Sequence, residues 1–326
     1  MATVTTTPRG QTAAERASEL NVLVRKQRSL WQDAWYRLVR NRAAVVGMFV
    51  VVAFMVLAAT VPLMTQFGWL KDQLKQDTPN ALMETIWAGS KYTLATYPLG
   101  SDQLGRDILS RLIWSTQISM LVGFVPVSII FLVGVSVGLV AGFYGGWTDQ
   151  ILMRITDVVY AFPDLLFLFI IMATLRNTPL GDIQGGLLLI FVAIAIVNWV
   201  GMARLVRGQV LALKEREFVE AARAIGAPAR RIMTRHLFPN ILAPVIVSVA
   251  FGIPSAMLAE ATLSFFGIGI KPPTPSWGIM INEGFVVFST TAWPVLLPAV
   301  CISIVMLAFT FLSDGLRDAL DPRMKI

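Results

Sequence analysis

Long runs of apolar residues, separated by shorter polar stretches, dominate this chain. An α-helix needs about 20 residues to cross the ~30 Å hydrocarbon layer of a bilayer, and several runs reach that length. The run from Ala43 to Met64 contains no charged residue. The pattern predicts six membrane-spanning helices, at Ala43 to Met64, Ile118 to Tyr144, Ile151 to Leu175, Leu187 to Met202, Ile241 to Leu263 and Trp293 to Leu312.

The composition supports an all-α membrane protein and argues against an enzyme. Of the 326 residues, 56% are hydrophobic and 14% are charged, which is more apolar surface than the core of one soluble domain can bury. One His and one Cys cannot assemble a zinc site, and Cys301 has no disulfide partner. The sequence has no phosphate-binding loop and no activated nucleophile, so we expect no catalytic residue, no metal and no cofactor in this chain.

Basic residues gather beside the apolar runs and predict the orientation. Residues 1–42 and residues 204–240 each carry eight Lys and Arg against three acids, whereas residues 264–292 carry one basic residue, Lys271. By the positive-inside rule, both termini and the 204–240 loop are expected in the cytoplasm. The net charge of +7 then reflects the orientation of the chain in a membrane rather than nucleic-acid binding.

The spans divide the chain into five segments. We expect a cytoplasmic tail (1–42), a first transmembrane helix (43–64), an external subdomain (65–117), a core of five helices that includes the 204–240 loop (118–314) and a second cytoplasmic tail (315–326). In the external subdomain, Leu104, Ile108 and Leu112 recur on one helical face.

An amphipathic basic helix is predicted at the end of the first tail. Trp31, Ala34, Trp35 and Leu38 recur at helical spacing among Lys and Arg residues. Such a helix lies on the cytoplasmic leaflet, with its rings at headgroup depth and its cations near anionic lipid. The alternative is an ordinary basic flank.

Three glycines mark a packing face in the second span. Gly134, Gly138 and Gly142 lie at four-residue intervals, so three side chains are missing from one helix face. Another helix backbone can approach closely there. The spacing does not say whether that helix belongs to this chain or to a partner.

The third span differs from the others because it contains charged residues. Arg154, Asp157 and Asp164 lie in it, beside Pro163. Charge inside a membrane is costly and often marks a transport pathway, which makes Asp157 and Asp164 candidate pathway residues. The alternative is that Arg154 and Asp157, three residues apart, form a local pair near the cytoplasmic interface.

The 204–240 loop contains a short apolar helix in a water-exposed position. Phe218, Ala221, Ala222 and Ile225 recur on one face, and this face fits a groove on another protein. Glu220 is expected to pair with Arg216 and Arg223. Gly226 is expected to end the helix in a left-handed turn, and Pro228 to discourage a restart. The alternative is a connecting helix packed on its own bundle.

This loop resembles a known motif. In EREFVEAARAIGAPARRIMTRHLFPN (215–240), the residues Glu220, Ala221, Ala222, Gly226 and Pro239 match the EAA motif of permease subunits in ATP-binding-cassette importers. His236 and Phe238 depart from the general pattern in the way typical of the peptide-permease branch. The stretches YPLGSDQLGRDILSRLIW (97–114), EATLSFFGIGIKPPTPSWG (260–278) and DGLRDALDPRMKI (314–326) also resemble the dipeptide and oligopeptide permease subfamily.

The resemblance implies a type I importer fold, a place in the bacterial cytoplasmic (inner) membrane and a set of partners. They are a homologous second permease, two ATPase subunits that bind ATP and Mg, and an external solute-binding protein, with this chain as the second permease of the pair. It also implies an ATPase-coupling role for Phe218, Glu220, Ala221, Ala222, Gly226 and Pro239. The expected cargo is di- or oligopeptides, and importers of nickel, haem or cationic peptides share the same pattern.

Two readings of another class remain open on the residues alone. An ion-coupled secondary transporter would use Asp157 and Asp164, and it leaves the loop helix unexplained. A membrane scaffold without transport would show no uptake defect when deleted.

Overall fold

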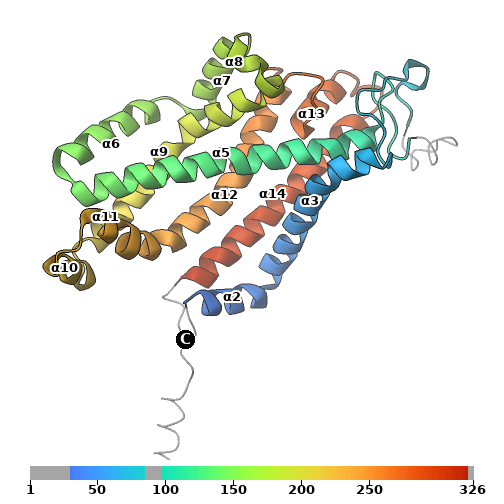
Figure 1. Cartoon of the computed structure of the whole chain (residues 1–326). Helices are drawn as coiled ribbons and strands as arrows, with labels where there is room; N and C mark the ends of the chain where they lie inside the picture. Colours follow the sequence, from blue (N-terminus) through green and yellow to red (C-terminus); the bar gives the residue numbers. More distant parts are fainter. Residues whose placement is uncertain (1–29, 85–96, 322–326) are drawn as a thin grey trace, which may run out of the picture.

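The computed structural model describes residues 30–84 and 97–321, and this part of the chain is almost entirely helical (Figure 1). The helices in order are α2 (Leu30–Arg40), α3 (Arg42–Gln66), η1 (Thr78–Asn80), α5 (Ile108–Tyr144), α6 (Gly146–Tyr160), α7 (Asp164–Leu175), α8 (Pro179–Asp182), η3 (Ile183–Gly186), α9 (Leu187–Leu213), α10 (Glu217–Ala224), α11 (Ala229–Arg231), η4 (Ile232–Leu237), α12 (Phe238–Phe265), α13 (Trp277–Phe285) and α14 (Trp293–Leu320).

Six spans are confirmed when the bent pair α6 and α7 is taken as one. Five further helical stretches of the described chain are long and apolar enough to cross a membrane: α3, α5, α8 to α9, α11 to α12, and α14. The two helices of the pair are bent by 80° at a short break before Asp164. Pro163 occupies the position before α7, where its ring disfavours a helical conformation of the preceding residue.

Several spans are longer than the apolar pattern predicts. α5 begins at Ile108 rather than Ile118, α9 continues to Leu213, and α14 continues to Leu320, past the expected core boundary at 314. Polar residues in the added turns of α5 and α9 are paired within the protein, as Arg111 is with Asp102 and Arg207 is with Asp149. Apolar content alone therefore underestimates the lengths of these helices.

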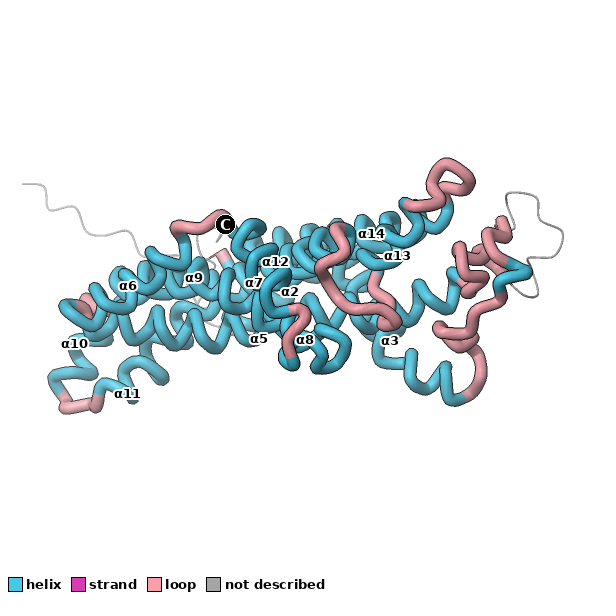
Figure 2. Tube along the Cα trace, turned by 90° about the horizontal axis from the view of Figure 1, so that it is seen from above, coloured by secondary structure: helices cyan, strands magenta, loops and turns pink. Residues whose placement is uncertain are grey.

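Ion pairs between segments that are distant in the sequence define one end of the bundle. At one end, Arg106 pairs with Glu283 at 2.6 Å and Lys271 pairs with Asp182 at 2.7 Å. Among the described residues, this α13 end comprises residues 67–84, 97–107, 176–186 and 266–292. The opposite α10 end comprises residues 144–146 and 214–237 together with both ends of the described chain, at α2 and at the last turn of α14 (Figure 1). In Figure 2, α10 and α11 lie far from α13. The alternating topology expected of six spans is thus present, while the side of the membrane that each end faces stays a prediction.

The glycine face of α5 packs on α9 of the same chain. A Cβ atom added at Gly138 would lie 2.6 Å from the Ala203 carbonyl oxygen, and one at Gly134 would lie 2.6 Å from the Met202 Cβ. Real Cβ atoms do not approach other atoms this closely. The predicted close packing is confirmed, and the neighbouring helix is intramolecular.

The amphipathic helix α2 is anchored to α14 rather than suspended. Ala34 and Leu38 are buried in a small apolar cluster with Ala44 and Ala319. Trp31 and Trp35 point away from this cluster and are exposed. The helix is therefore amphipathic as predicted, while its lipid contact stays a prediction; the rest of the first tail, residues 1–29, lies outside the described residues.

The helical face expected in the external subdomain is wrong in one residue, Leu104, which lies before the helix begins. Leu104 does not share a helix face with Ile108 and Leu112, because α5 begins only at Ile108. The Asp107 carboxylate accepts the Ser110 backbone N–H at 3.0 Å and so caps the helix start.

Candidate functional site

Helix α10 is a short helix whose charges suit its dipole. Glu217 and Glu220 lie in its first turn and Arg223 in its last. Acids near the N-terminus and bases near the C-terminus each stabilise a helix by about 0.3–1 kcal/mol. This pattern helps a segment of only eight residues to form a helix.

The apolar residues of α10 divide into an anchoring face and an exposed face. Val219 is 0% exposed and Ala222 is 4% exposed, and both belong to the main apolar cluster of the protein. Phe218 and Ile225 are 40% and 85% exposed. The expected single docking face is therefore wrong in part: Ala222 packs on its own bundle, and the surface open to another protein consists of Phe218, Ala221 and Ile225.

Gly226 ends α10 as predicted. Its φ is +77°, in the left-handed region, and the Gly226 N–H donates to the Arg223 carbonyl oxygen at 2.9 Å. The Ala227 N–H donates to the Ala222 carbonyl oxygen at 3.0 Å. These two bonds form a Schellman motif, which satisfies carbonyl groups at the helix end and fixes the direction of the departing chain.

The chain returns to helix directly after Pro228, so the expectation that this proline discourages a restart is wrong. Pro228 is the N-cap of α11, where its missing N–H has no helical partner to lose. The π-helical η4 follows and joins α12, with Pro239 in the first turn of α12. The Asn240 side-chain amide donates to the His236 carbonyl oxygen at 2.6 Å. α10 therefore sits on a continuous helical stem that runs into the bundle.

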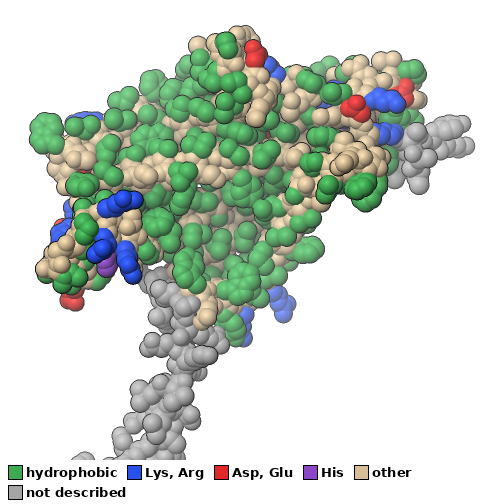
Figure 3. Space-filling model, in the orientation of Figure 1, with side chains coloured by type: hydrophobic (Ala, Val, Ile, Leu, Met, Phe, Trp, Pro, Cys, Tyr) green, Lys and Arg blue, Asp and Glu red, His purple; other side chains and the backbone are tan. Residues whose placement is uncertain are grey.

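Glu220 is exposed at the surface of α10. Within the described part of the chain, neither Arg216 nor Arg223 forms an ion pair with it, so that expectation is wrong. The Arg223 guanidinium instead lies over the Phe143 ring, 5.6 Å from its centroid, and ties α10 to the end of α5. Lys and Arg side chains and the single histidine are grouped at this end of the molecule (Figure 3).

The two pathway candidates lie in different places. Asp157 pairs with Arg204 of α9 at 2.7 Å, whereas the alternative to the pathway role had paired it with Arg154. The Arg204 guanidinium also lies 4.2 Å from the Tyr160 ring centroid. Together with the pair between Asp149 and Arg207, these contacts hold α6 against α9.

Asp164 lines a cavity of about 520 Å³ between α5, α7, α9 and α12. Asn198 of α9 and the α12 residues Ser255 and Thr262 line it as well, among mostly apolar side chains. Asp157 lies instead in a separate cavity of about 230 Å³. The pathway role of either acid remains a prediction, and only Asp164 faces the larger space.

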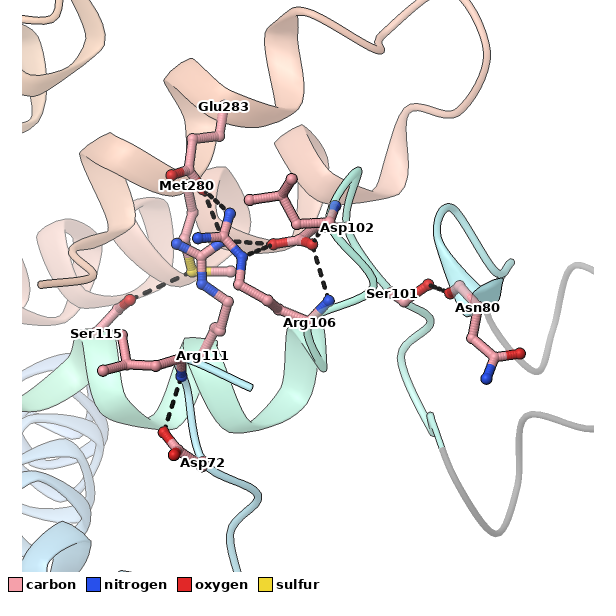
Figure 4. A network of polar contacts seen from close by, with 11 residues as sticks. Asp72, Asn80, Ser101, Asp102, Arg106, Arg111, Ser115, Met280 and Glu283 are labelled. Atoms are coloured by element: carbon pink, nitrogen blue, oxygen red, sulfur yellow. Dashed lines mark hydrogen bonds and ion pairs between the residues drawn. The ribbon is translucent and has the colours of Figure 1, made fainter. Parts of the chain in front are cut away.

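A buried ion-pair network at the α13 end was not anticipated from the sequence (Figure 4). The Asp102 and Glu283 carboxylates each pair with both Arg106 and Arg111, and all four N–O distances are 2.6 Å. The network joins the segment before α5 to α13. The acidic and basic residues within the motif 97–114 could have indicated local ion pairs. No spacing rule connects them with Glu283, because it lies far along the chain.

Glu260 was also missed, although an acid inside an apolar span is itself a signal. It is 1% exposed, and the hydroxyl groups of Ser264 and Ser276 both donate to its Oε1 at 2.7 Å. Ser276 also accepts the Ile279 N–H at 3.2 Å and caps α13. Glu260 thus holds α13 to the end of α12.

A smaller polar cluster lies at the α13 end, outside the spans. The Asp77 carboxylate accepts hydrogen bonds from the Asn80 amide and the Tyr97 hydroxyl, each at 2.8 Å. These bonds lower the pKa of Asp77. Burial, followed by the bond to Asp77, raises the pKa of Tyr97 to about 12.

Two families match this sequence. Residues 134–326 match the family described as the binding-protein-dependent transport system inner membrane component. Residues 29–82 match the N-terminal transmembrane domain of oligopeptide transport permease C. The second match covers α2, α3 and the start of the external subdomain.

Individual relatives extend over nearly the whole chain. The dipeptide transport system permease protein DppC of Bacillus subtilis is 38% identical over 95% of this chain and 91% of its own length. The oligopeptide transport system permease protein OppC of the same organism is 35% identical over 96% of both chains. An inward-facing structure of the MetNI methionine ABC transporter aligns with a TM-score of 0.50 at 18% identity, covering 66% of this chain and 98% of the other. The last match shows a shared fold.

Proposed function

Because this chain belongs to the binding-protein-dependent transport system inner membrane components, we propose that it moves di- and oligopeptides into the cytoplasm as part of an ATP-driven importer. The chain is a multi-pass permease subunit of a bacterial inner membrane, with the fold of ABC importer permeases. The observation that carries the proposal is α10, which holds exposed apolar side chains on a rigid stem at one end of the bundle.

The proposed partners follow from what this chain lacks. Its sequence contains no phosphate-binding loop, so in this proposal two ATPase subunits at the α10 end hold ATP and Mg and supply the hydrolysis, and this chain is a non-catalytic membrane subunit. A homologous second permease completes the transmembrane path. A solute-binding protein delivers the cargo at the α13 end, which is then external.

In the proposed mechanism, α10 acts as a lever between the ATPases and the bundle. Phe218, Ala221 and Ile225 enter a groove on an ATPase subunit, and Glu220 gives it a polar anchor. Val219 and Ala222 transmit the movement because they are buried in the bundle. Gly226 and Pro239 fix the direction of the stem, so that closure of the ATPases tilts α12.

The cargo is proposed from the relatives, whose names specify dipeptides and oligopeptides. Nickel, haem and cationic peptides are the alternative cargoes for the same machine. A solute-binding protein makes most of the selection in such a system, so the cargo is tested by transport.

The structure gives the alternative of an ion-coupled secondary transporter less support than the sequence alone does. Asp157 is held by Arg204, which leaves Asp164 as the one of the two acids that faces the large cavity. This alternative also assigns no task to the exposed face of α10.

The proposed function is tested by purification and transport together. The chain is tagged at its N-terminus, extracted gently from native membranes, and its companions are identified by mass spectrometry. Uptake of a labelled dipeptide is then measured in cells depleted of ATP and, separately, in cells treated with an uncoupler while ATP is kept constant. We expect a second permease, two ATPases and a binding protein, with uptake lost on ATP depletion. Recovery of the chain alone, with uptake lost only with the uncoupler, would contradict the proposal.

A further inference from the structure

The cavity that Asp164 lines has the size of a small-molecule site. Its volume is about 520 Å³, within the range of about 300–1,000 Å³ typical of ligand pockets. It lies within the spans, between the broken third span and helices α5, α9 and α12. A space of this kind at the break of a discontinuous membrane helix is where transporters of other folds place their substrates.

The polar groups in this cavity present hydrogen-bond acceptors. The Ser255 hydroxyl donates to the Phe251 carbonyl oxygen at 3.0 Å, and the Thr262 hydroxyl donates to the Leu258 carbonyl oxygen at 2.8 Å. Each hydroxyl proton is therefore used within α12, and its oxygen lone pairs remain for a ligand. The Asn198 amide donates one N–H to the Ile194 carbonyl oxygen at 2.9 Å, so its own carbonyl oxygen remains as an acceptor beside one further N–H.

Asp164 adds a negative charge to this acceptor-rich surface. No side chain in the described chain forms an ion pair or a hydrogen bond with its carboxylate, in contrast to Asp157. The residues that line the cavity include no Lys, Arg or His. A carboxylate facing a membrane cavity without a counter-charge is costly unless a cation comes from outside the chain.

We infer that this cavity binds the α-ammonium group of the transported peptide, with Asp164 as its counter-charge and the oxygens of Asn198, Ser255 and Thr262 as further acceptors. A peptide N-terminus carries three N–H donors and one positive charge, which complements a carboxylate surrounded by acceptors. Apolar side chains such as Leu168 and Val249 line the same space and suit the side chains of the cargo. The inference rests on the proposed function because it names the part of the cargo that this chain contacts.

Two simpler roles for Asp164 make different predictions. As a residue of the first turn of α7, it offsets the helix dipole, and its loss would then affect every cargo equally. If a cation of the second permease pairs with it, its loss would also affect every cargo equally. Only an ammonium site makes the effect depend on the cargo.

The test uses the complete transporter in proteoliposomes, with its binding protein and ATP. Two labelled cargoes are compared: a dipeptide and its deamino analogue, which lacks only the α-ammonium group, each supplied as saturated binding protein. The variants are Asp164→Asn, Asp164→Glu and the matched control Asp157→Asn, which removes an acid of the same span outside the cavity. Uptake and ATP hydrolysis are recorded for both cargoes.

Wild type should take up the dipeptide faster than the analogue. Asp164→Asn should lower dipeptide uptake about tenfold, as expected for one charge-assisted contact, and leave uptake of the analogue within about twofold. Asp164→Glu should restore much of the difference, and Asp157→Asn should retain it.

Equal loss for both cargoes, or an undiminished preference for the dipeptide in Asp164→Asn, would overturn the ammonium site while leaving peptide import in place. If the wild-type transporter hydrolyses ATP but takes up neither cargo, the proposed peptide function itself is overturned, and the ammonium site with it.

Discussion

The two ends of the bundle differ in which side chains they bury and which they expose. At the α13 end, Arg106 and Arg111 are buried and paired with acids from two separate segments. At the α10 end, Glu220 is exposed without an ion pair within the described chain, and Ile225 is 85% exposed.

This difference indicates different tasks. Buried ion pairs fix the register of the segments that they join, because loss of one partner leaves an unpaired charge in a poorly hydrated place. Exposed apolar side chains on a rigid helix are instead typical of a surface that another protein covers. The α13 end is built to hold its shape, and the α10 end is built to meet a partner.

The largest effect is expected from breaking the network at the α13 end. Arg111→Met leaves Arg106 as the single cation shared by the Asp102 and Glu283 carboxylates. One negative charge of the network then has no compensating charge, so the change should lower the free energy of unfolding by about 3 kcal/mol. Thermal unfolding of the purified protein in detergent measures the change. Lys271→Met is the matched control, because it breaks a pair at the same end whose acid is 71% exposed; it should cost less than about 1 kcal/mol. Equal losses in the two variants would refute a special role for burial.

The next effect concerns the exposed face of α10. Ile225→Asp should leave the unfolding temperature unchanged and weaken binding of the ATPase subunits by about 2 kcal/mol, the value of one buried isoleucine. Titration of the purified permeases with ATPase measures the affinity. Ile225→Met keeps an apolar side chain and should bind nearly as tightly as wild type. If both variants bind like wild type, Ile225 does not lie in the interface.

A smaller effect is expected from the turn that aims α10. Gly226→Val forces a β-branched residue into the left-handed region, at a cost of about 1–2 kcal/mol, and should lower coupled uptake and ATP hydrolysis severalfold. Gly226→Asn is the control, since asparagine tolerates this conformation. Wild-type uptake and hydrolysis in Gly226→Val would show that the lever assignment is wrong.

The smallest effect is a local pH dependence at the α13 end. Because the folded structure lowers the pKa of Asp77 below its ordinary value of 3.8, its bonds stabilise the fold above that pH and are lost as the pH falls below it. Hydrogen exchange of the backbone amides in residues 77–80 is followed from pH 6 to pH 3, and their protection relative to the intrinsic exchange rate should fall in acid. Tyr97→Phe removes one of the bonds and should reduce this pH dependence; an unchanged dependence would exclude the Tyr97 bond as its source.

The sequence predicts the spans well because a helix that crosses the hydrocarbon layer must be apolar at nearly every position over about 20 residues. It also predicts the left-handed turn at Gly226 and the small-residue face around Gly138, since both depend on a missing side chain. The ends of the spans are less predictable, because residues such as Arg111 and Arg207 extend a helix once distant partners neutralise them.

In the candidate site, too, local sequence predicts some features, whereas others depend on contacts with distant segments. Helical periodicity places Phe218, Ala222 and Ile225 on a common face, but it does not reveal which part of that face the protein itself covers. That depends on the α11 to η4 stem, which returns under α10 and buries Ala222. The separate surroundings of Asp157 and Asp164 likewise depend on α9, which supplies Arg204 to one acid and not to the other.

The central claim is that the exposed face of α10 contacts an ATPase, and site-specific crosslinking tests it most directly. A photoreactive amino acid is placed at position 225 in the tagged chain and, as a control, at position 286 of the α13 end, where Val286 is 74% exposed. The crosslinked companions are identified by mass spectrometry after illumination of intact cells. We expect the probe at 225 to capture an ATPase subunit and the probe at 286 to capture none. Capture of an ATPase from position 286, or its absence at 225 in cells that import peptide, would contradict this account.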